Sequence, residues 1–250
     1  MEPADRLQQL IEAAIRVFTA KGYRLAQMDD IANEMGVSKG TLYNYVESKE
    51  ALFFLIFDQG FGQREIGPKR KLPIPTPPIA ATLRRVRERM LTASQLQLLE
   101  SALARDTVAD PRAELEAIVR EFYAVIAEMR HAGDLIERCA RDVPQLAELF
   151  YVQGRRSLID LLSRYLEKRI EGGYFAAVPD VPTSARFITE SIVWFARHRH
   201  NTPDSKMISD EAALTTTVHM LANALVPAAA TRARQSESTR SRIRSTGRKR

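Results

Sequence analysis

The sequence is short of the features that mark membrane, secreted and metal-bound proteins. Cys139 is the single cysteine among 250 residues, which excludes an internal disulfide and a cysteine-rich metal site. No apolar run approaches the roughly 18 residues that a membrane span requires. The opening residues 1–5 are acidic and lack the basic start and apolar stretch of a secretory signal. These absences predict a soluble cytoplasmic protein without a membrane partner, in which Cys139 packs as a small apolar residue.

Catalytic signatures are also missing. The chain contains no nucleophile–base motif, no phosphate-binding loop and no dinucleotide fingerprint. His198 and His200 flank Arg199, but residues two apart on a helix point to different faces, which disfavours a shared metal ion. We therefore predict no enzyme activity, no cofactor and no metal site. Turnover of a ligand in a helical pocket would revive the enzyme alternative.

The alternation of apolar and polar residues that marks half-buried strands is rare in this chain. Apolar residues instead recur at spacings of three and four, which predicts an all-α fold. The first helix, expected over residues 5–21, carries one continuous apolar stripe of Leu7, Leu10, Ile11, Ala14, Ile15 and Phe18. Further helices are expected near residues 28–35, 38–45, 48–61, 79–93, 95–107, 112–131, 134–141, 145–171, 183–199 and 209–226.

Positive charge is scarce at the N-terminus and concentrated at the opposite end. The net charge is +6, but residues 231–250 alone hold eight basic side chains and one acidic one, whereas residues 1–60 hold six basic and nine acidic ones. Local pattern, rather than net charge, therefore has to identify a nucleic-acid interface. The Arg-rich tail either adds phosphate contacts without sequence preference or is a solvated appendage. Arg84, Arg85, Arg87 and Arg89 are expected to form a solvated face; the alternatives are ion pairs with acidic side chains or contacts with DNA phosphate.

Proline marks a boundary between two helical regions. Residues 67–78 contain five prolines in twelve positions, which no helix interior tolerates. We expect a semi-extended loop there. The predicted organisation is an N-terminal domain over residues 1–62, a connecting loop over 63–78, a larger helical domain over 79–228 and a disordered tail over 229–250.

Residues 22–53 have the pattern of a helix-turn-helix. A short helix, a turn at Gly36 and a second short helix capped by Ser38 form a corner that can place the second helix in the major groove. Leu42 and Val46 can hold that helix on the domain core while its other side chains face outward. The residues expected to contact DNA are Lys39, Gly40, Thr41, Tyr43, Asn44, Tyr45 and Lys49.

Each of these residue types suits a contact with a duplex. Gly40 has no side chain, so the helix can approach the duplex closely at that point. The hydroxyls of Thr41, Tyr43 and Tyr45 can bond phosphate oxygens. Lys39 and Asn44 can reach base edges, and Lys39 can equally contact a phosphate. Lys49 lies in the first turn of the next helix, where it can clamp a phosphate beside free N–H groups.

On these residues the sequence resembles the TetR family of bacterial transcription regulators. The resemblance covers residues 8–57 and is carried by Gly22-Tyr23, Asp30-Ile31-Ala32, Gly36-Val37-Ser38, Gly40-Thr41-Leu42-Tyr43, Tyr45, Ser48-Lys49-Glu50 and Leu52-Phe53. One departure stands before the second helix, where the family usually has Ser or Thr and this chain has Ala26-Gln27. Loss of that cap is expected to cost about 1 kcal/mol of local stability.

The resemblance implies a homodimer on a palindromic double-stranded operator, with repression released by a small effector. The larger helical domain would then bind the effector and form the dimer. A non-specific architectural DNA-binding protein is the alternative. Candidate pocket residues are Phe122, Met129, Phe150, Tyr151, Tyr165 and Trp194, and each of them can equally be ordinary core. The candidate dimer interface is Ile188, Ile192, Phe195, Leu214, Val218, Leu221 and Leu225, and these stripes can equally face their own subunit's core.

Overall fold

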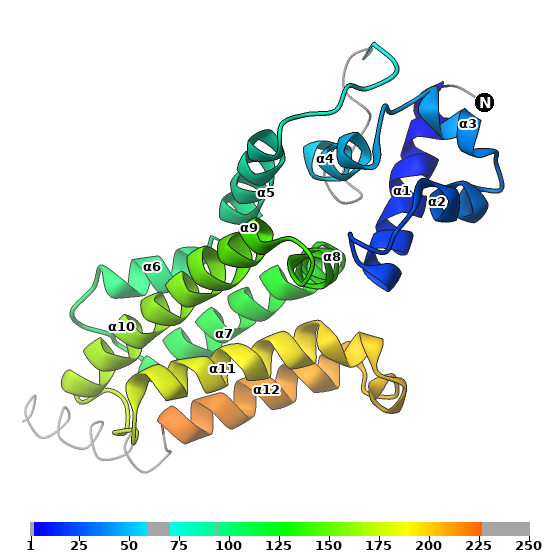
Figure 1. Cartoon of the computed structure of the whole chain (residues 1–250). Helices are drawn as coiled ribbons and strands as arrows, with labels where there is room; N and C mark the ends of the chain where they lie inside the picture. The colour runs from blue at the N-terminus through cyan, green and yellow to red at the C-terminus, as the bar shows by residue number, and fades with distance from the viewer. Residues whose placement is uncertain (1–2, 60–70, 94, 227–250) are drawn as a thin grey trace, which may run out of the picture. The chain divides into compact units, whose positions relative to one another are not determined.

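The described part of the chain, residues 3–59, 71–93 and 95–226 of the computed structural model, contains helices and no strand (Figure 1). The predicted all-α fold is therefore confirmed. None of the described helices is long and apolar enough to cross a membrane. The predicted disordered tail over 229–250 lies outside the described ranges, as do residues 63–70 of the predicted connecting loop.

Contacts group the described helices into two units that interleave along the chain. The first unit comprises the described residues up to Gln95 together with Met129–Ser157. The second comprises Leu96–Glu128 and the described residues from Leu158 onward. Each unit is thus assembled from two separate stretches of the chain. The predicted domain bounds stay a prediction.

The first unit opens with the four helices that the sequence predicts. They are α1 (Pro3–Lys21), α2 (Met28–Met35), α3 (Lys39–Tyr43) and α4 (Lys49–Gln59). Helix α2 ends at Gly36, whose φ of 67° is the left-handed conformation that favours glycine. Helix α3 is shorter than expected, and just beyond its end Ile74 N–H donates to the Tyr45 carbonyl at 2.8 Å, where Val46 and Ile74 form an isolated bridge.

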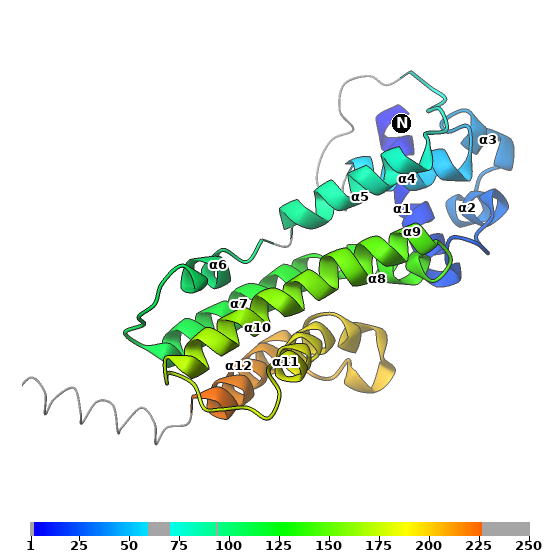
Figure 2. The same ribbon diagram turned by 60° about the vertical axis from the view of Figure 1, so that its left-hand side comes forward.

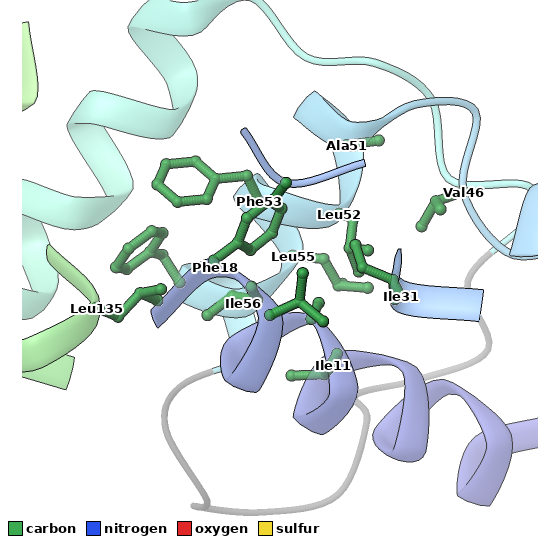
Figure 3. Close-up of a cluster of buried hydrophobic side chains, with 14 of the residues drawn as sticks. Ile11, Phe18, Ile31, Val46, Ala51, Leu52, Phe53, Leu55, Ile56 and Leu135 are labelled. Atoms are coloured by element: carbon green, nitrogen blue, oxygen red, sulfur yellow. The ribbon is translucent and has the colours of Figure 1, made fainter. Parts of the chain in front are cut away.

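Apolar side chains from all four helices meet in one core (Figure 3). Ile11 and Phe18 of α1 lie against Leu52 and Leu55 of α4, and Ile31 of α2 joins them. The predicted α1 stripe is confirmed, since its members are fully buried except for Ile15, which is half-buried. Burying such side chains is the main favourable term in folding, so this core fixes α2 and α3 on their scaffold.

Later segments of the chain complete the first unit. They are α5 (Ile79–Ala93), α8 (Arg130–Ala140), α9 (Pro144–Ala147) and a nine-residue π-helix, η1 (Glu148–Arg156). Helix α8 packs on α1, and α5 packs on α4. The helix predicted as continuous over residues 145–171 is therefore interrupted, and its regular part is α10 (Ser157–Glu171).

The second unit contains α10 together with α6 (Gln97–Leu103), α7 (Pro111–Glu128), α11 (Val181–Ala196) and α12 (Asp210–Leu225). Helices α11 and α12 pack on each other and on α7, and Figures 1 and 2 both show them side by side. Asp180 and Ser209 cap α11 and α12 by accepting hydrogen bonds from Thr183 N–H and Ala212 N–H.

Candidate nucleic-acid interface

Helix α3 is fixed by a cap at its start and by buried side chains on its inner face and just after its end. The Ser38 hydroxyl caps its start by accepting a hydrogen bond from Thr41 N–H at 3.3 Å. Leu42 is fully buried in the core of the first unit, and Val46 is buried immediately after the helix. This arrangement presents the opposite face of α3 to solvent, as the helix-turn-helix pattern predicts.

Four of the seven predicted DNA-contacting residues lie exposed on α3 or at its end. They are Lys39, Gly40, Tyr43 and Asn44. A Cβ atom built on Gly40 would have no neighbour closer than 3.8 Å, so the space above that backbone is open. Tyr43 is 42% exposed, so its ring and hydroxyl are accessible from solvent. These residues therefore form an exposed surface on α3, as the predicted DNA contacts require.

Thr41 and Tyr45 are half-buried, and Thr41 already has a partner. The Thr41 hydroxyl lies 3.0 Å from the Ser38 hydroxyl, so part of its bonding capacity serves the helix cap. Tyr45 packs on the core of the first unit, and its backbone carbonyl accepts from Ile74. Their contacts with DNA stay predictions.

Lys49 serves the protein's own backbone. Its ammonium group donates to the Tyr23 carbonyl at 2.9 Å and to the Ala26 carbonyl at 3.0 Å, and it lies 4.6 Å from the centre of the Tyr23 ring. These contacts join the loop between α1 and α2 to the first turn of α4. Sequence reasoning missed this role because nothing local places that loop beside α4, and the predicted phosphate contact of Lys49 stays a prediction.

The same loop is also fastened from α8. Arg138 donates to the Lys21 carbonyl at 2.7 Å, and the Asp142 carboxylate accepts from Arg24 N–H at 3.0 Å. Gly22 has a φ of 82°, which favours glycine, and a Cβ there would fall 2.5 Å from Asp142 Oδ2 and would displace that carboxylate. The sequence distance of more than a hundred residues hides these contacts from pattern analysis.

The missing Ser or Thr cap before α2 is replaced by another residue. The Asp30 carboxylate accepts from Gln27 N–H at 3.0 Å, so a residue inside the helix reaches back to its start. Lys21 donates to the same carboxylate at 2.7 Å, and this bond and the Gln27 bond hold the pKa of Asp30 below its usual value. The cost expected from the absent cap is therefore offset by Asp30.

The residues predicted to form a dimer interface lie within the core of the second unit. Ile188 and Ile192 of α11 are buried there with Val218, Leu221 and Leu225 of α12. Phe195 and Leu214 are half-buried against the same core. The outward surfaces of the two helices instead carry Phe187, Trp194 and Met220, which are 67, 38 and 64% exposed. The stripes thus face their own subunit, the alternative that the sequence also allowed.

The six predicted pocket residues are divided between the two units. In the second unit, Phe122 and Tyr165 are buried core residues, whereas Trp194 is exposed. In the first, Phe150 and Tyr151 pack edge to face with ring centres 5.0 Å apart, and Met129 precedes α8. The structure contains a cavity of about 710 Å³ in the first unit and one of about 280 Å³ in the second, and none of the six residues lines either.

The helix-turn-helix segment is similar in sequence to known proteins. Residues 10–56 match the family described as "Bacterial regulatory proteins, tetR family". The fatty acid metabolism regulator protein of Bacillus subtilis is 36% identical over 58 residues, which are 23% of this chain and 30% of that protein. The HTH-type transcriptional activator FasR of Mycolicibacterium smegmatis is 42% identical over 55 residues, which are 22% of this chain and 25% of that protein. The aligned segments therefore span less than a third of these relatives.

Solved structures align over more of the chain but with low similarity. A TetR-like transcriptional regulator from Rhodococcus sp. RHA1 is 23% identical, with a TM-score of 0.46, over 87% of this chain and 94% of its own. FadR from Bacillus subtilis in complex with stearoyl-CoA is 20% identical, with a TM-score of 0.42, over 86% of this chain and 96% of its own. Scores at this level carry no functional conclusion. The family match at residues 10–56, shared with curated transcriptional regulators, identifies this chain as carrying the helix-turn-helix domain of the TetR family of transcriptional regulators.

Proposed function

We propose that this protein is a sequence-specific DNA-binding transcription regulator in which α3 is the recognition helix. The observation that carries the proposal is the exposure of Lys39, Gly40, Tyr43 and Asn44 on a helix anchored by the buried Leu42. Lys39 and Asn44 read base edges, and the Tyr43 hydroxyl and nearby backbone N–H groups contact phosphates. The family match over residues 10–56 supports this assignment.

The charge of the N-terminal segment favours selective over general binding. Residues 1–60 hold more acidic than basic side chains, so this segment has little general attraction for phosphate. Affinity then depends on a good fit between α3 and the right bases. This is the property that separates a sequence-specific regulator from a non-specific architectural protein.

A second copy of the chain is the partner we propose for the outward face of α11 and α12. Phe187, Trp194 and Met220 expose large apolar surfaces on these neighbouring helices. Apolar side chains exposed together on packed helices are typical of an interface that another subunit covers. A two-fold dimer would present two α3 helices to successive major grooves, about 34–36 Å apart on a palindromic operator.

An effector site is proposed within the first unit, in the cavity of about 710 Å³ lined by residues of α5, α9 and η1. Leu83, Pro144 and Leu149 supply apolar walls, and among the charged lining residues Arg84 and Arg87 of α5 outnumber the acidic Glu148. A small organic molecule with an apolar body and an anionic group matches this chemistry. The effector would release the protein from its operator, as in a repressor.

Contacts between α5 and α4 give such an effector a physical route to α3. Arg85 bonds the Asp58 carboxylate at 2.8 and 2.5 Å. Arg89 donates to the carbonyls of Phe57 and Asp58 at 3.1 and 2.9 Å, which are among the last carbonyls of α4. Displacement of α5 therefore pulls on α4, and α4 follows α3 directly in the chain. The shift is limited by the difference in effector affinity between the two states.

Selection of bound duplexes from a random pool tests the proposal. The expected result is an enriched palindrome whose half-sites are one helical turn apart. A Lys39→Ala, Asn44→Ala variant should lose the enrichment while keeping the unfolding free energy of the native protein. Binding without any enriched sequence would contradict the proposal and favour the architectural alternative.

A further inference from the structure

Lys39, the first residue of α3, is paired within the protein. Its ammonium nitrogen lies 2.8 Å from Asp29 Oδ2, and Asp29 is the second residue of α2. The side chains of Lys39 and Asp29 are 46 and 58% exposed, so both remain within reach of a bound duplex. The hydrogen bond from Lys39 to Asp29 raises the pKa of the Lys39 ammonium, which therefore stays charged.

The other carboxylates of α2 are engaged elsewhere. Asp30 binds Lys21 and the backbone N–H of Gln27. Glu34 pairs with Arg16 of α1 at 2.6 Å. Among the described acidic residues of α2, Asp29 is thus the one whose carboxylate meets a cation of the recognition helix.

We propose that Asp29 is a specificity-determining residue of the DNA interface, and this inference rests on the proposed function. In the free protein, Asp29 forms an ion pair with the Lys39 ammonium, and Lys39 leaves this pair only when a duplex offers it stronger hydrogen-bond acceptors. A surface ion pair is weak, so two well-placed base acceptors replace it readily. A single phosphate offers Lys39 little more than Asp29 does, so Lys39 adds little to the binding of arbitrary DNA while Asp29 is present. Asp29 therefore weakens binding to arbitrary DNA more than binding to the operator.

The effect of removing this carboxylate follows from counterion release. Each new phosphate contact changes the slope of log K against log salt by about −0.9. A contact that adds no affinity at 1 M salt therefore increases the affinity about eightfold at 0.1 M salt. Asp29→Asn keeps the shape of the side chain and frees Lys39 to make one such contact with any duplex.

The experiment compares Asp29→Asn with Glu34→Gln in the full-length protein. Both substitutions change one acid of α2 to its amide, but Glu34 pairs with Arg16 rather than with α3. Dissociation constants are measured over a salt series for a random-sequence duplex and for the duplex selected by the native protein. Asp29→Asn is expected to bind the random duplex about eightfold more tightly than Glu34→Gln at 0.1 M salt, with a slope steeper by about 1. Its affinity for the selected duplex should rise by less, so the ratio of specific to random affinity falls.

A double-mutant cycle with Lys39→Ala identifies the mechanism. In the Lys39→Ala background, Asp29→Asn should bind random duplex no more tightly than Glu34→Gln does. A gain that persists there would overturn the inference, because Asp29 would then act by general repulsion. Equal affinities of Asp29→Asn and Glu34→Gln in the native background would also overturn it. Failure of the native protein to select any sequence would instead contradict the proposed function.

Discussion

An ion pair between α2 and α3 and an ion pair inside the second unit place similar charges in opposite surroundings. Lys39 and Asp29 meet at the surface and remain about half exposed. Arg169 and Glu114 meet at 2.7 Å with side-chain exposures of 0 and 8%. Water screens the first pair and is excluded from the second. The surface pair can therefore be exchanged for another partner, as the proposed function requires, whereas the buried pair holds helices together.

The buried pair also satisfies its remaining hydrogen-bonding groups. Arg169 donates to the Ala102 carbonyl at 2.7 Å and to the Arg105 carbonyl at 3.1 Å, near the end of α6. The Tyr165 hydroxyl donates to Glu114 at 3.1 Å, and burial followed by the Glu114 charge raises the pKa of that hydroxyl. Charge inside a protein is tolerated only with such a complete set of partners. The comparison thus separates residues available for function from residues committed to the fold.

Arg169→Met should give the largest effect. It leaves the buried Glu114 carboxylate with only the longer ion pair to the exposed Arg105 at 3.5 Å, so the unfolding free energy is expected to fall by about 3–5 kcal/mol. Urea denaturation measures the change, with Arg164→Met as the control because Arg164 is exposed on the same helix. A loss as small as that of the control would show that water reaches the buried pair.

Substitutions on the two faces of α11 and α12 should separate folding from association. Val218→Asp places an unpaired charge among buried side chains, and the unfolding free energy should fall by about 3 kcal/mol or more. Phe187→Glu, at a side chain that is 67% exposed, should leave the unfolding free energy of the subunit unchanged and convert dimers to monomers by light scattering. Dimers that survive Trp194→Glu together with Phe187→Glu would exclude the outward face as the interface.

Lys49→Met tests whether the Lys49 ammonium belongs with the fold or with the DNA surface. It removes two charge-assisted hydrogen bonds to backbone carbonyls, each worth about 1.5–3 kcal/mol, part of which bound water recovers. We expect the unfolding free energy to fall by about 2 kcal/mol with no change in the salt slope of DNA binding. Lys39→Met should do the reverse. A flatter slope for Lys49→Met would restore its predicted phosphate contact.

Cys139 should show the smallest effect, as a dependence of stability on alkaline pH. Burial, followed by the nearby Asp142 charge, raises the pKa of its thiol to about 12. The folded protein keeps this proton above pH 8.5, where the unfolded chain loses it, so stability falls as pH rises. The contribution is about 1 kcal/mol at pH 9.5, measured as the difference from Cys139→Ala. Identical pH profiles of the two proteins would contradict this expectation.

Burial of Cys139 also predicts its reactivity. A thiol reagent should label Cys139 only after unfolding.

Local pattern predicted the helices and the turn of the N-terminal segment, because these features are built from local signals. The spacing of Leu7 to Phe18, the left-handed turn at Gly36 and the cap at Ser38 each act within a few residues. The buried Leu42 and the exposed Lys39 follow from helix periodicity alone. The predicted Cys139 packing is also confirmed, since that side chain is buried.

Pattern analysis failed where contacts join distant segments. Lys49 looks like a surface cation from its position at a helix start, and only the placement of the Tyr23 and Ala26 carbonyls gives it an internal role. The apolar stripe of Val218, Leu221 and Leu225 looks the same whether it faces another subunit or its own core. The ion pair of Lys39 with Asp29 depends on the angle between two helices.

Helix positions, the turn between α2 and α3 and the outward chemistry of α3 are written in the order of residues, because hydrogen bonds and side-chain periodicity within a helix act over four residues or fewer. The partner of each charged group and the direction in which each apolar stripe faces came from folding. These properties arise when segments a hundred residues apart meet, and burial then turns a charge or an apolar face from a surface feature into part of the core.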